Sequence, residues 1–429
     1  MRKVNPTPAG RWLAAAWVGI LAGHAAAADA PANHGRFYFG AGAPPAGFQA
    51  VATNSAYSDA AGFGFEPGAA PAATPGAMTA AHGFQFSVRL PEGNYAVTAT
   101  LGGGATAAET TVNAELRRLM VERVRTPAGG TETRKFIVNV RQPHLPAGGA
   151  VRLTEREKTA ERRAWDDRLT LEFLGVNPAV AALEIAPVEV PTVFLIGDST
   201  VCDQPTEPYN SWGQMLPRFF QPTVAVANHA ESGESLAGAL AKGRFNKIWS
   251  QFHAGDYLIV QFGHNDMKST AADALEKYTE NLRRVVAEAR KRGGQAILCT
   301  PVSRRSFGPD GKIENSFRGY PEAVRLVARE ENVPLLDLQQ MGAALYEALG
   351  PEGSHRAFAT AREGTHHGNY GSYEIAQCVL QALRQNQVPL ARQIVPEFTG
   401  FDPAHPDSAA NFRLPTGHPA AAVPPPPGN

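Results

Sequence analysis

Short apolar runs that end in polar turns recur through the second half of the chain. The first run, residues 193–196, ends in the turn Gly197-Asp198-Ser199. We expect strands at residues 193–197, 224–228, 257–262, 295–300 and 334–337. Segments with the spacing of amphipathic helices lie between these runs. Such alternation of strand and helix predicts a parallel sheet with helices on both faces.

Polar residues follow the expected strands, where the loops of an open parallel sheet build the functional site. Ser199 follows the first strand, Gly233 follows the second, and residues 263–266 (Gly-His-Asn-Asp) follow the third. Glu363 and His366 precede a further expected helix. The pattern therefore predicts that segments far apart in the sequence meet at one edge of the sheet.

These residue types fit nucleophilic catalysis by serine. A serine hydroxyl needs a base to accept its proton, an acid to orient that base, and donors for the oxyanion that forms. Ser199, His366 and Glu363 can supply nucleophile, base and acid, and the Asn265 amide can donate to an oxyanion. In the structural alternative, Asp and Ser cap a turn, Asn265 caps another, and Gly233 only permits a positive φ.

The segments resemble, in order, the four blocks of the SGNH (GDSL-type) hydrolase superfamily. The resemblance covers residues 191–390 and is closest to bacterial rhamnogalacturonan acetylesterases, through residues 197–201, 212–214, 263–266 and 364–367. It implies a three-layer, flavodoxin-like α/β fold with Ser199 as nucleophile and His366 as base. It also implies an oxyanion hole formed by Ser199, Gly233 and Asn265. The family usually has Asp at the position of Glu363.

Five further residues are candidates for substrate binding. Tyr209 and Trp212 follow the nucleophile, and an aromatic ring there can stack on a sugar or cover the core. Arg304 and Arg305 follow the fourth strand, where a guanidinium can bind a uronate carboxylate or simply pair in a loop. The candidates from these loops are His264, Trp212, Arg304, Arg305 and His367. His264 and Asp266 can instead organise their loop, and His367 can instead pack.

The chain divides into four expected parts. Residues 1–28 read as a signal peptide, with a basic start, an apolar stretch and small residues near Ala27. Residues 34–187 show alternating runs at 36–39, 84–90, 94–101, 136–140 and 169–174, which predict an all-β sandwich domain. Residues 191–400 form the expected hydrolase domain. Residues 401–429, rich in Pro and Ala, are expected to be a poorly ordered tail.

Composition limits the partners. Lys and Arg together number 40, as do Asp and Glu, so the formal net charge is zero. This balance argues against nucleic acid or an anionic membrane surface as the main partner. The histidine spacing fits no metal motif, and we expect neither metal nor cofactor. The three cysteines, Cys202, Cys299 and Cys378, are too few for a disulfide framework and are expected to be buried thiols.

Together, the residues and the resemblance predict a secreted or periplasmic serine esterase. Its expected substrate is an acetylated polysaccharide or oligosaccharide of the plant cell wall, most closely pectic rhamnogalacturonan. The alternatives are an acetylxylan esterase or another carbohydrate esterase, or a carbohydrate-binding protein whose hydrolase domain is degenerate. Neither a nucleic acid nor, after signal cleavage, a membrane is expected as a partner.

Overall fold

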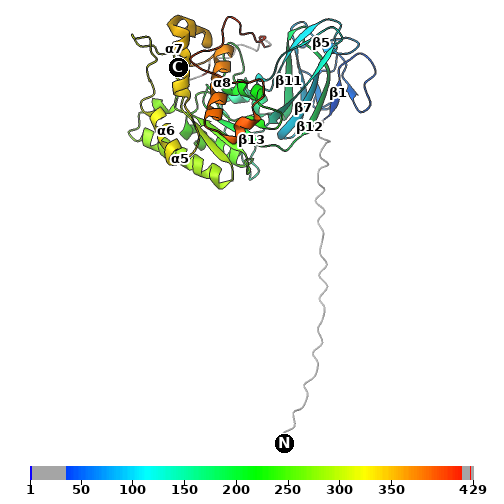
Figure 1. Cartoon of the computed structure of the whole chain (residues 1–429). Coiled ribbons are helices and arrows are strands. Elements are labelled where there is room, and N and C mark those ends of the chain that lie inside the picture. The colour runs from blue at the N-terminus through cyan, green and yellow to red at the C-terminus, as the bar shows by residue number, and fades with distance from the viewer. Residues whose placement is uncertain (2–34, 418–425, 427–429) are drawn as a thin grey trace. The chain divides into compact units, whose positions relative to one another are not determined.

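The computed structural model describes residue 1, residues 35–417 and residue 426. The expected signal peptide, apart from Met1, and most of residues 418–429 lie outside the described residues. Residues 35–417 belong to one compact unit, which contains three sheets. Two of them are formed by the N-terminal region, and the third is formed by the part of the chain that carries the candidate site (Figure 1).

The first N-terminal sheet has seven strands and is antiparallel except where β1 pairs with β2. Its main path is β10 (Thr131–Val140), β7 (Gly93–Gly102), β12 (Ala179–Pro187), β1 (Arg36–Tyr38) and β2 (Gln49–Ala50), and β5 (Met78–Thr79) joins β12 to β4 (Ala72–Ala73). The second sheet is antiparallel, in the order β3 (Phe63–Phe65), β6 (Phe84–Arg89), β11 (Arg168–Val176), β8 (Ala108–Ala114) and β9 (Arg118–Thr126).

The two N-terminal sheets share one apolar core. In β7, Tyr95, Val97 and Leu101 are buried at every second position, as expected for a strand with one face toward a core. They belong to the same cluster as Phe86 and Phe173 of the second sheet. The region is therefore rich in antiparallel sheet, as expected. It is not all-β, because α1 (Glu155–Lys158) and η1 (Arg162–Trp165) interrupt it.

The third sheet is parallel throughout and confirms the five strands expected from the apolar runs. Its order is β14 (Ala225–Asn228), β13 (Thr192–Gly197), β15 (Tyr257–Gln261), β16 (Gln295–Cys299) and β17 (Leu335–Leu336). Each neighbouring pair is parallel. In chain order this is second, first, third, fourth and fifth, which is the flavodoxin-like arrangement.

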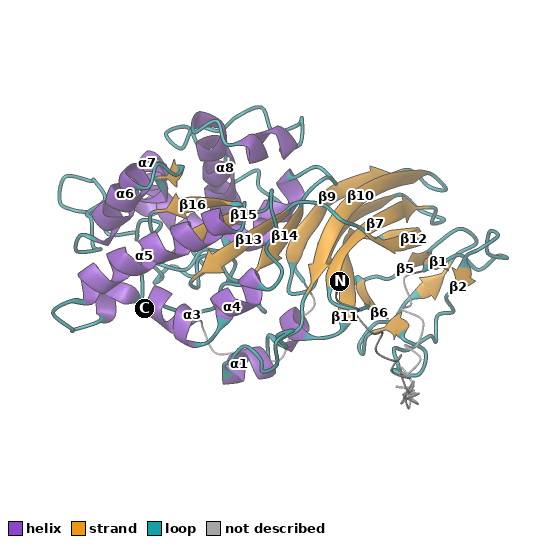
Figure 2. Cartoon of the chain, turned by 90° about the horizontal axis from the view of Figure 1, so that it is seen from below, coloured by secondary structure: helices purple, strands orange, loops and turns teal. Residues whose placement is uncertain are grey.

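Alternate residues of β13 point into two different cores. Val193 and Leu195 pack in a cluster with several helices, among them α8 (Asn369–Gln385), whereas Phe194 and Ile196 pack with others, among them α5 (Ala274–Lys291). The sheet is thus covered on both faces, with α5 and α8 on opposite sides of it in Figure 2. The first layer contains α2 (Trp212–Met215), η2 (Leu216–Phe219), α7 (Leu338–Gly353), η4 (Ser354–Ala357), α8 (Asn369–Gln385) and η5 (Pro389–Gln393). The second contains α3 (Leu236–Ala241), α4 (Arg244–Trp249), α5 (Ala274–Lys291) and α6 (Tyr320–Glu330), and η3 (Asp266–Lys268) follows β15.

Buried ion pairs join the N-terminal region to the α/β region. The Arg118 guanidinium lies 2.6 Å from the Asp203 carboxylate, and both side chains are 2% exposed. Arg244 binds Glu157 of α1 through two 2.8 Å hydrogen bonds. Removing one member of such a pair leaves an uncompensated buried charge, which typically costs about 3–5 kcal/mol of stability. The boundaries expected between separate domains therefore stay a prediction.

Residues 401–417 differ from the expected poorly ordered tail. The side chains of Phe412 and Leu414 pack against the core cluster that contains α8. The backbone N–H of Asp407 donates to Glu374 at 3.0 Å, and the Tyr370 hydroxyl donates to the Asp407 carbonyl at 2.7 Å. A segment rich in proline and alanine can thus be held in place by a few apolar and polar contacts that its composition does not reveal.

The contact between Glu374 and Asp407 should make stability depend on pH. Burial, and then the Asp407 carboxylate, raise the pKa of Glu374 to about 8. An unfolded glutamate titrates near about 4.3, so between these values the folded state holds a proton that the unfolded state has released. Stability should therefore fall as pH rises through this window. In Glu374→Gln, urea unfolding should show a fall between about pH 5 and about pH 8 that is smaller by roughly 3–4 kcal/mol.

The matched control is Glu352→Gln, because Glu352 is an exposed glutamate of α7. This variant should keep the pH dependence of the unchanged protein. A Glu374→Gln protein with the same pH dependence as its parent would show that Glu374 does not hold a proton in the folded state.

Candidate active site

Ser199 lies in the turn that follows β13. The strand ends at Gly197, where a Cβ atom would lie 2.4 Å from the backbone oxygen of Gln261 on β15, so only glycine fits there. The chain can then turn sharply at the carboxyl edge of the sheet. Ser199 is 2% exposed, and its Oγ lies 2.9 Å from Nε2 of His366.

His366 and Glu363 come from the loop that precedes α8. The Nδ1 atom of His366 lies 3.2 Å from Oε1 of Glu363, and the backbone N–H of His366 donates to Oε2 at 3.3 Å. All three side chains of the Ser199–His366–Glu363 chain are at most 5% exposed. A carboxylate on Nδ1 favours the tautomer whose Nε2 accepts a proton from serine. The arrangement can therefore activate the Ser199 hydroxyl, and the longer Glu side chain reaches the imidazole.

Asp198 ties the nucleophile turn to the loop after β15. Its Oδ1 accepts hydrogen bonds from the backbone and the hydroxyl of Thr200, at 3.0 and 2.9 Å. Its Oδ2 lies 3.1 Å from Nδ1 of His264. Burial raises the pKa of Asp198, but His264 and the two bonds from Thr200 outweigh it and hold this pKa below its usual value. His264 is 2% exposed and packs edge-on against Phe317, so its loop-organising alternative has direct support.

Gly233 and Asn265 lie in the loops that follow β14 and β15. Gly233 is exposed and has a φ of 74°, a conformation that favours glycine. The Asn265 side chain donates from Nδ2 to the backbone oxygen of Glu234 at 3.1 Å. A side-chain amide carries two N–H groups, so one remains for a substrate oxygen. This bond brings Asn265 next to the segment that carries Gly233.

Two expected substrate-binding residues, Trp212 and His367, are buried in the core, which supports their structural alternatives. Trp212 is fully buried at the start of α2, and its Nε1 donates to Gln261 at 2.9 Å. His367 is fully buried, stacks on Phe358, and lies 2.6 Å from the Tyr346 hydroxyl. Burial lowers the pKa of His367 to about 3. Neither ring is available to a sugar.

The two arginines after β16 have different surroundings. Arg305 donates to the Ser354 hydroxyl at 3.1 Å and to the Pro351 carbonyl at 3.0 Å, which supports its structural alternative. Arg304 is partly buried, with its guanidinium over the Phe317 ring and 3.4 Å from the carbonyl of His264. Burial lowers the pKa of Arg304. Of the two, Arg304 is the better placed to meet a ligand near the nucleophile turn.

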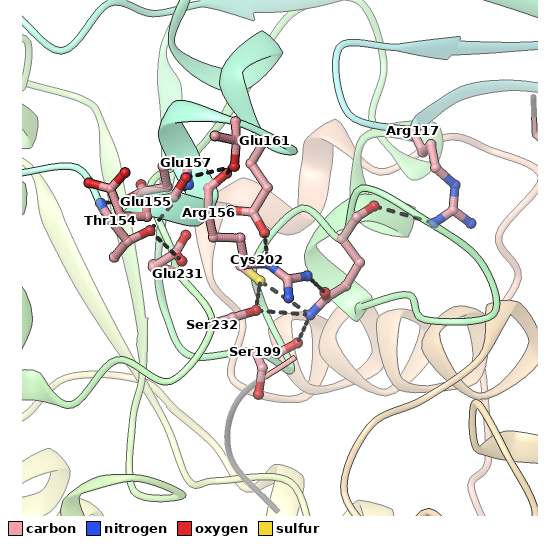
Figure 3. Close-up of polar contacts among 12 residues, drawn as sticks. Arg117, Thr154, Glu155, Arg156, Glu157, Glu161, Ser199, Cys202, Glu231 and Ser232 are labelled. Carbon is pink, nitrogen blue, oxygen red and sulfur yellow. Dashed lines mark hydrogen bonds and ion pairs between the residues drawn. The ribbon is translucent and has the colours of Figure 1, made fainter. Parts of the chain in front are cut away.

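Sequence reasoning missed three residues that hold the nucleophile turn. The Gln204 side chain donates from Nε2 to the backbone oxygen of Ser199 at 2.9 Å, and its Oε1 accepts from Arg156 of α1 at 3.1 Å. Arg117 donates to the backbone oxygens of Gln204 and Tyr209 at 3.3 and 2.9 Å. In Figure 3, Arg156 extends from the N-terminal region toward Cys202 and Ser199. No local pattern marks these residues, because their roles depend on contacts between distant parts of the chain.

The cysteines and the carboxylates suggest no further chemistry. Cys202, Cys299 and Cys378 are free and buried, and burial raises the pKa of the Cys202 thiol well above its usual value. Within residues 35–417, no group of three or more His, Cys, Asp or Glu side chains is arranged to hold a metal ion.

None of the helices that the described residues form is long and apolar enough to span a bilayer.

Comparisons with known proteins match the region of the site and extend beyond it. A model of the GDSL-like lipase/acylhydrolase family matches residues 195–371. The rhamnogalacturonan acetylesterase RhgT of Bacillus subtilis (strain 168) is 35% identical over 217 residues, which are 47% of this chain and 94% of that protein. The uncharacterized esterase YxiM of the same strain is 28% identical over 375 residues, or 82% of this chain and 91% of that protein.

A crystal structure of protein YxiM from Bacillus subtilis is 25% identical to the chain and has a TM-score of 0.47, covering 83% of this chain and 99% of that one. The probable rhamnogalacturonan acetylesterase YesY of Bacillus subtilis (strain 168) is 30% identical over 213 residues, which are 48% of this chain and 98% of that protein. Because the chain covers nearly all of two relatives at 30–35% identity, it belongs to the GDSL-like lipase/acylhydrolase family, the SGNH hydrolases, and is an enzyme.

Proposed function

We propose that the protein is a serine carbohydrate esterase that removes O-acetyl groups from a plant cell-wall polysaccharide. The observation that carries the proposal is the chain of contacts from Ser199 Oγ to His366 Nε2 at 2.9 Å and from His366 Nδ1 to Glu363 Oε1 at 3.2 Å. A degenerate binding protein would have no reason to keep nucleophile, base and acid in hydrogen-bonded order.

The first step is acylation of Ser199. Its Oγ attacks the acetyl carbonyl carbon while His366 Nε2 accepts the hydroxyl proton, and Glu363 stabilises the imidazolium. The backbone N–H groups of Ser199 and Gly233 and the side chain of Asn265 donate to the oxyanion. When the tetrahedral intermediate collapses, the C–O bond to the sugar breaks, and His366 returns the proton to the sugar oxygen. The products are a free sugar hydroxyl and an acetyl ester on Ser199.

The second step is hydrolysis of that ester. A water molecule gives a proton to His366 Nε2 and attacks the acetyl carbon through the same oxyanion site. Collapse of the intermediate breaks the bond to Ser199 Oγ, which takes the proton from His366, and acetate leaves. No cofactor is needed to balance either step.

Replacing Asn265 by alanine should lower kcat by roughly 10²–10³, the usual effect of removing one oxyanion donor. The change also removes the bond to the Glu234 carbonyl, so a melting curve verifies that the variant is folded. Asn265→Asp is the second variant: it keeps the size of the side chain but has no amide donor, so it loses both the oxyanion donor and the bond to Glu234. Initial rates on p-nitrophenyl acetate measure both. A near-normal kcat in either variant would remove Asn265 from the oxyanion site.

The substrate and the location of the enzyme are parts of the same proposal. The names of the relatives RhgT and YesY support acetylated rhamnogalacturonan, a component of pectin, as the substrate. The basic and apolar start of the chain supports secretion to the periplasm or the medium. The shared core of the two antiparallel sheets supports a β-sandwich as the accessory part of the enzyme.

Acetate release from a panel of acetylated polymers tests this function. Acetylated rhamnogalacturonan should be the preferred substrate, with slower release from acetylated xylan. Preference for xylan would favour the acetylxylan alternative. Absence of acetate from every polymer, and of p-nitrophenol from p-nitrophenyl acetate, would leave the non-catalytic alternative.

A further inference from the structure

A large groove lies on the N-terminal region, outside the catalytic loops. Its volume is about 1370 Å³, and its walls come from β8, β9 and β11, from the segment around η1, and from residues 413–417. Apolar side chains form part of the surface, including Leu414, which is partly buried, and Val176, which is 64% exposed. An open surface with this mixture of polar and apolar side chains suits a chain of sugars, which presents hydroxyls and C–H faces together.

Arginines dominate the charge of this groove. Five of them line it, against three glutamates: Arg117, Arg123, Arg162, Arg163 and Arg413, with Glu109, Glu115 and Glu172. Glu109 is already bound by Arg123 and by the neighbouring Arg125. Arg117 is paired with Glu207, and Arg163 lies 3.8 Å from Glu66. The other two arginines, Arg162 and Arg413, are exposed, and among the described residues neither lies within ion-pair distance of an acidic side chain. The groove therefore offers guanidinium groups that are not already neutralised.

One of the buried glutamates of the groove, Glu115, reduces this excess very little. Glu115 accepts a hydrogen bond from the backbone N–H of Thr170 at 3.1 Å. Burial raises the pKa of Glu115 to about 8, because a carboxylate there would lose its hydration. At neutral pH the Glu115 side chain is therefore mainly uncharged, and the lining is more positive than its residue count suggests.

The groove reaches the segment that holds the nucleophile turn. Pro205 is one of its lining residues and directly follows Gln204, whose side chain donates to the Ser199 carbonyl. Arg117 lines the groove and also donates to the carbonyls of Gln204 and Tyr209. The ring of Tyr209 packs edge-on against His366 at 6.0 Å. A polymer in the groove would thus run toward the residues next to the catalytic chain of contacts.

We propose that this groove binds an anionic polysaccharide through the carboxylates of its uronic acid units, and that it guides the polymer to Ser199. The proposal rests on the proposed function, since it supplies the long-chain specificity of that same enzyme. Guanidinium groups suit carboxylates because their parallel N–H donors match the two oxygens. The part of the groove that the structure describes has no Phe, Tyr or Trp in its lining, whereas single-stranded nucleic acids are commonly bound by stacking on such rings.

Calorimetric titration of the full chain with an oligogalacturonate that carries no acetyl group tests this proposal without any turnover. The carboxyl-reduced oligomer, which is neutral and of equal length, is the matched ligand. We expect the acidic oligomer to bind more tightly than the neutral one, with an affinity that falls as NaCl is added. In the double variant Arg162→Ala/Arg413→Ala, binding of the acidic oligomer should weaken about tenfold or more.

Two further variants isolate the cause. Arg284→Ala/Arg329→Ala removes two exposed arginines of α5 and α6 and should bind as the unchanged protein does. Arg162→Lys/Arg413→Lys keeps the charge and should recover part of the affinity. A melting curve for each variant verifies that it is folded.

Three results would contradict binding of an anionic polysaccharide in this groove. They are no binding of the acidic oligomer, equal binding of the neutral oligomer, or an unchanged affinity in Arg162→Ala/Arg413→Ala. These results are independent of acetate release. If the oligomer does not bind but acetyl esters are hydrolysed, the groove proposal is wrong and the proposed function is unaffected. If the oligomer binds but no acetyl ester is hydrolysed, the groove proposal holds and the proposed function is wrong.

Discussion

Ser199→Ala should lower kcat for acetyl ester hydrolysis by on the order of 10⁶-fold, the effect seen when a serine nucleophile is removed from such a chain of residues. The hydroxyl that the variant lacks is the atom that lies 2.9 Å from His366 Nε2. Fold and stability should change little, because the Ser199 backbone contacts, including the bond from Gln204, remain. Initial rates on p-nitrophenyl acetate and a melting curve measure the two effects.

The control for this variant is Ser408→Ala, which removes an exposed hydroxyl from the C-terminal segment. It should keep full activity. Activity retained in folded Ser199→Ala, beyond the residual catalysis that an oxyanion site gives alone, would mean that another residue is the nucleophile.

The second large effect is expected at Glu363. In Glu363→Gln, kcat should fall by roughly 10²–10⁴, because an amide cannot stabilise the imidazolium and can favour the wrong tautomer of His366. Glu363→Asp keeps the charge but shortens the reach to Nδ1, which is 3.2 Å away. It should therefore retain more activity than Glu363→Gln.

Rates on p-nitrophenyl acetate, with melting curves for both variants, measure the role of Glu363. A higher kcat in Glu363→Asp than in Glu363→Gln would show that the charge of Glu363 matters, and not only its packing. If Glu363→Gln and Glu363→Asp lost activity equally and were equally destabilised, Glu363 would be a structural residue of its loop, and another group would have to orient His366.

The parallel sheet could be predicted from sequence because its signals are local. Each central strand is a short apolar run, and each run is followed by a polar turn that ends it. The expected strand at residues 257–262 ends one residue earlier, at Gln261, and the one at 295–300 ends at Cys299. The order of the catalytic segments then follows from the geometry of parallel strands, whose carboxyl ends lie at one edge.

The N-terminal region was harder to predict. The strands β8 and β9 mix charged and apolar residues, and β9 has irregular pairing near Val121. A bulge of this kind breaks the simple alternation that marks a strand. The short strands β2 and β4 have only two residues each, too few for any pattern.

Sequence alone could not decide between the two alternatives for Trp212 and His367. A Trp or a His next to a catalytic loop can face the ligand or the core, and the choice depends on tertiary packing. Trp212 is fully buried with its N–H on Gln261, and His367 is buried against Tyr346. Conversely, Arg156 and Gln204 meet only because α1 is brought against the nucleophile turn. Sequence spacing alone carries no information about such a contact.

Labelling with diethyl p-nitrophenyl phosphate shows directly whether Ser199 is the nucleophile. Attack by a serine Oγ on phosphorus forms a stable phosphate ester and releases p-nitrophenolate. We expect one diethylphosphoryl group per chain, found by mass spectrometry on the peptide that contains Ser199, with esterase activity lost in proportion to the label. Loss of activity with the label on a different residue, or full labelling of Ser199 with activity intact, would contradict it.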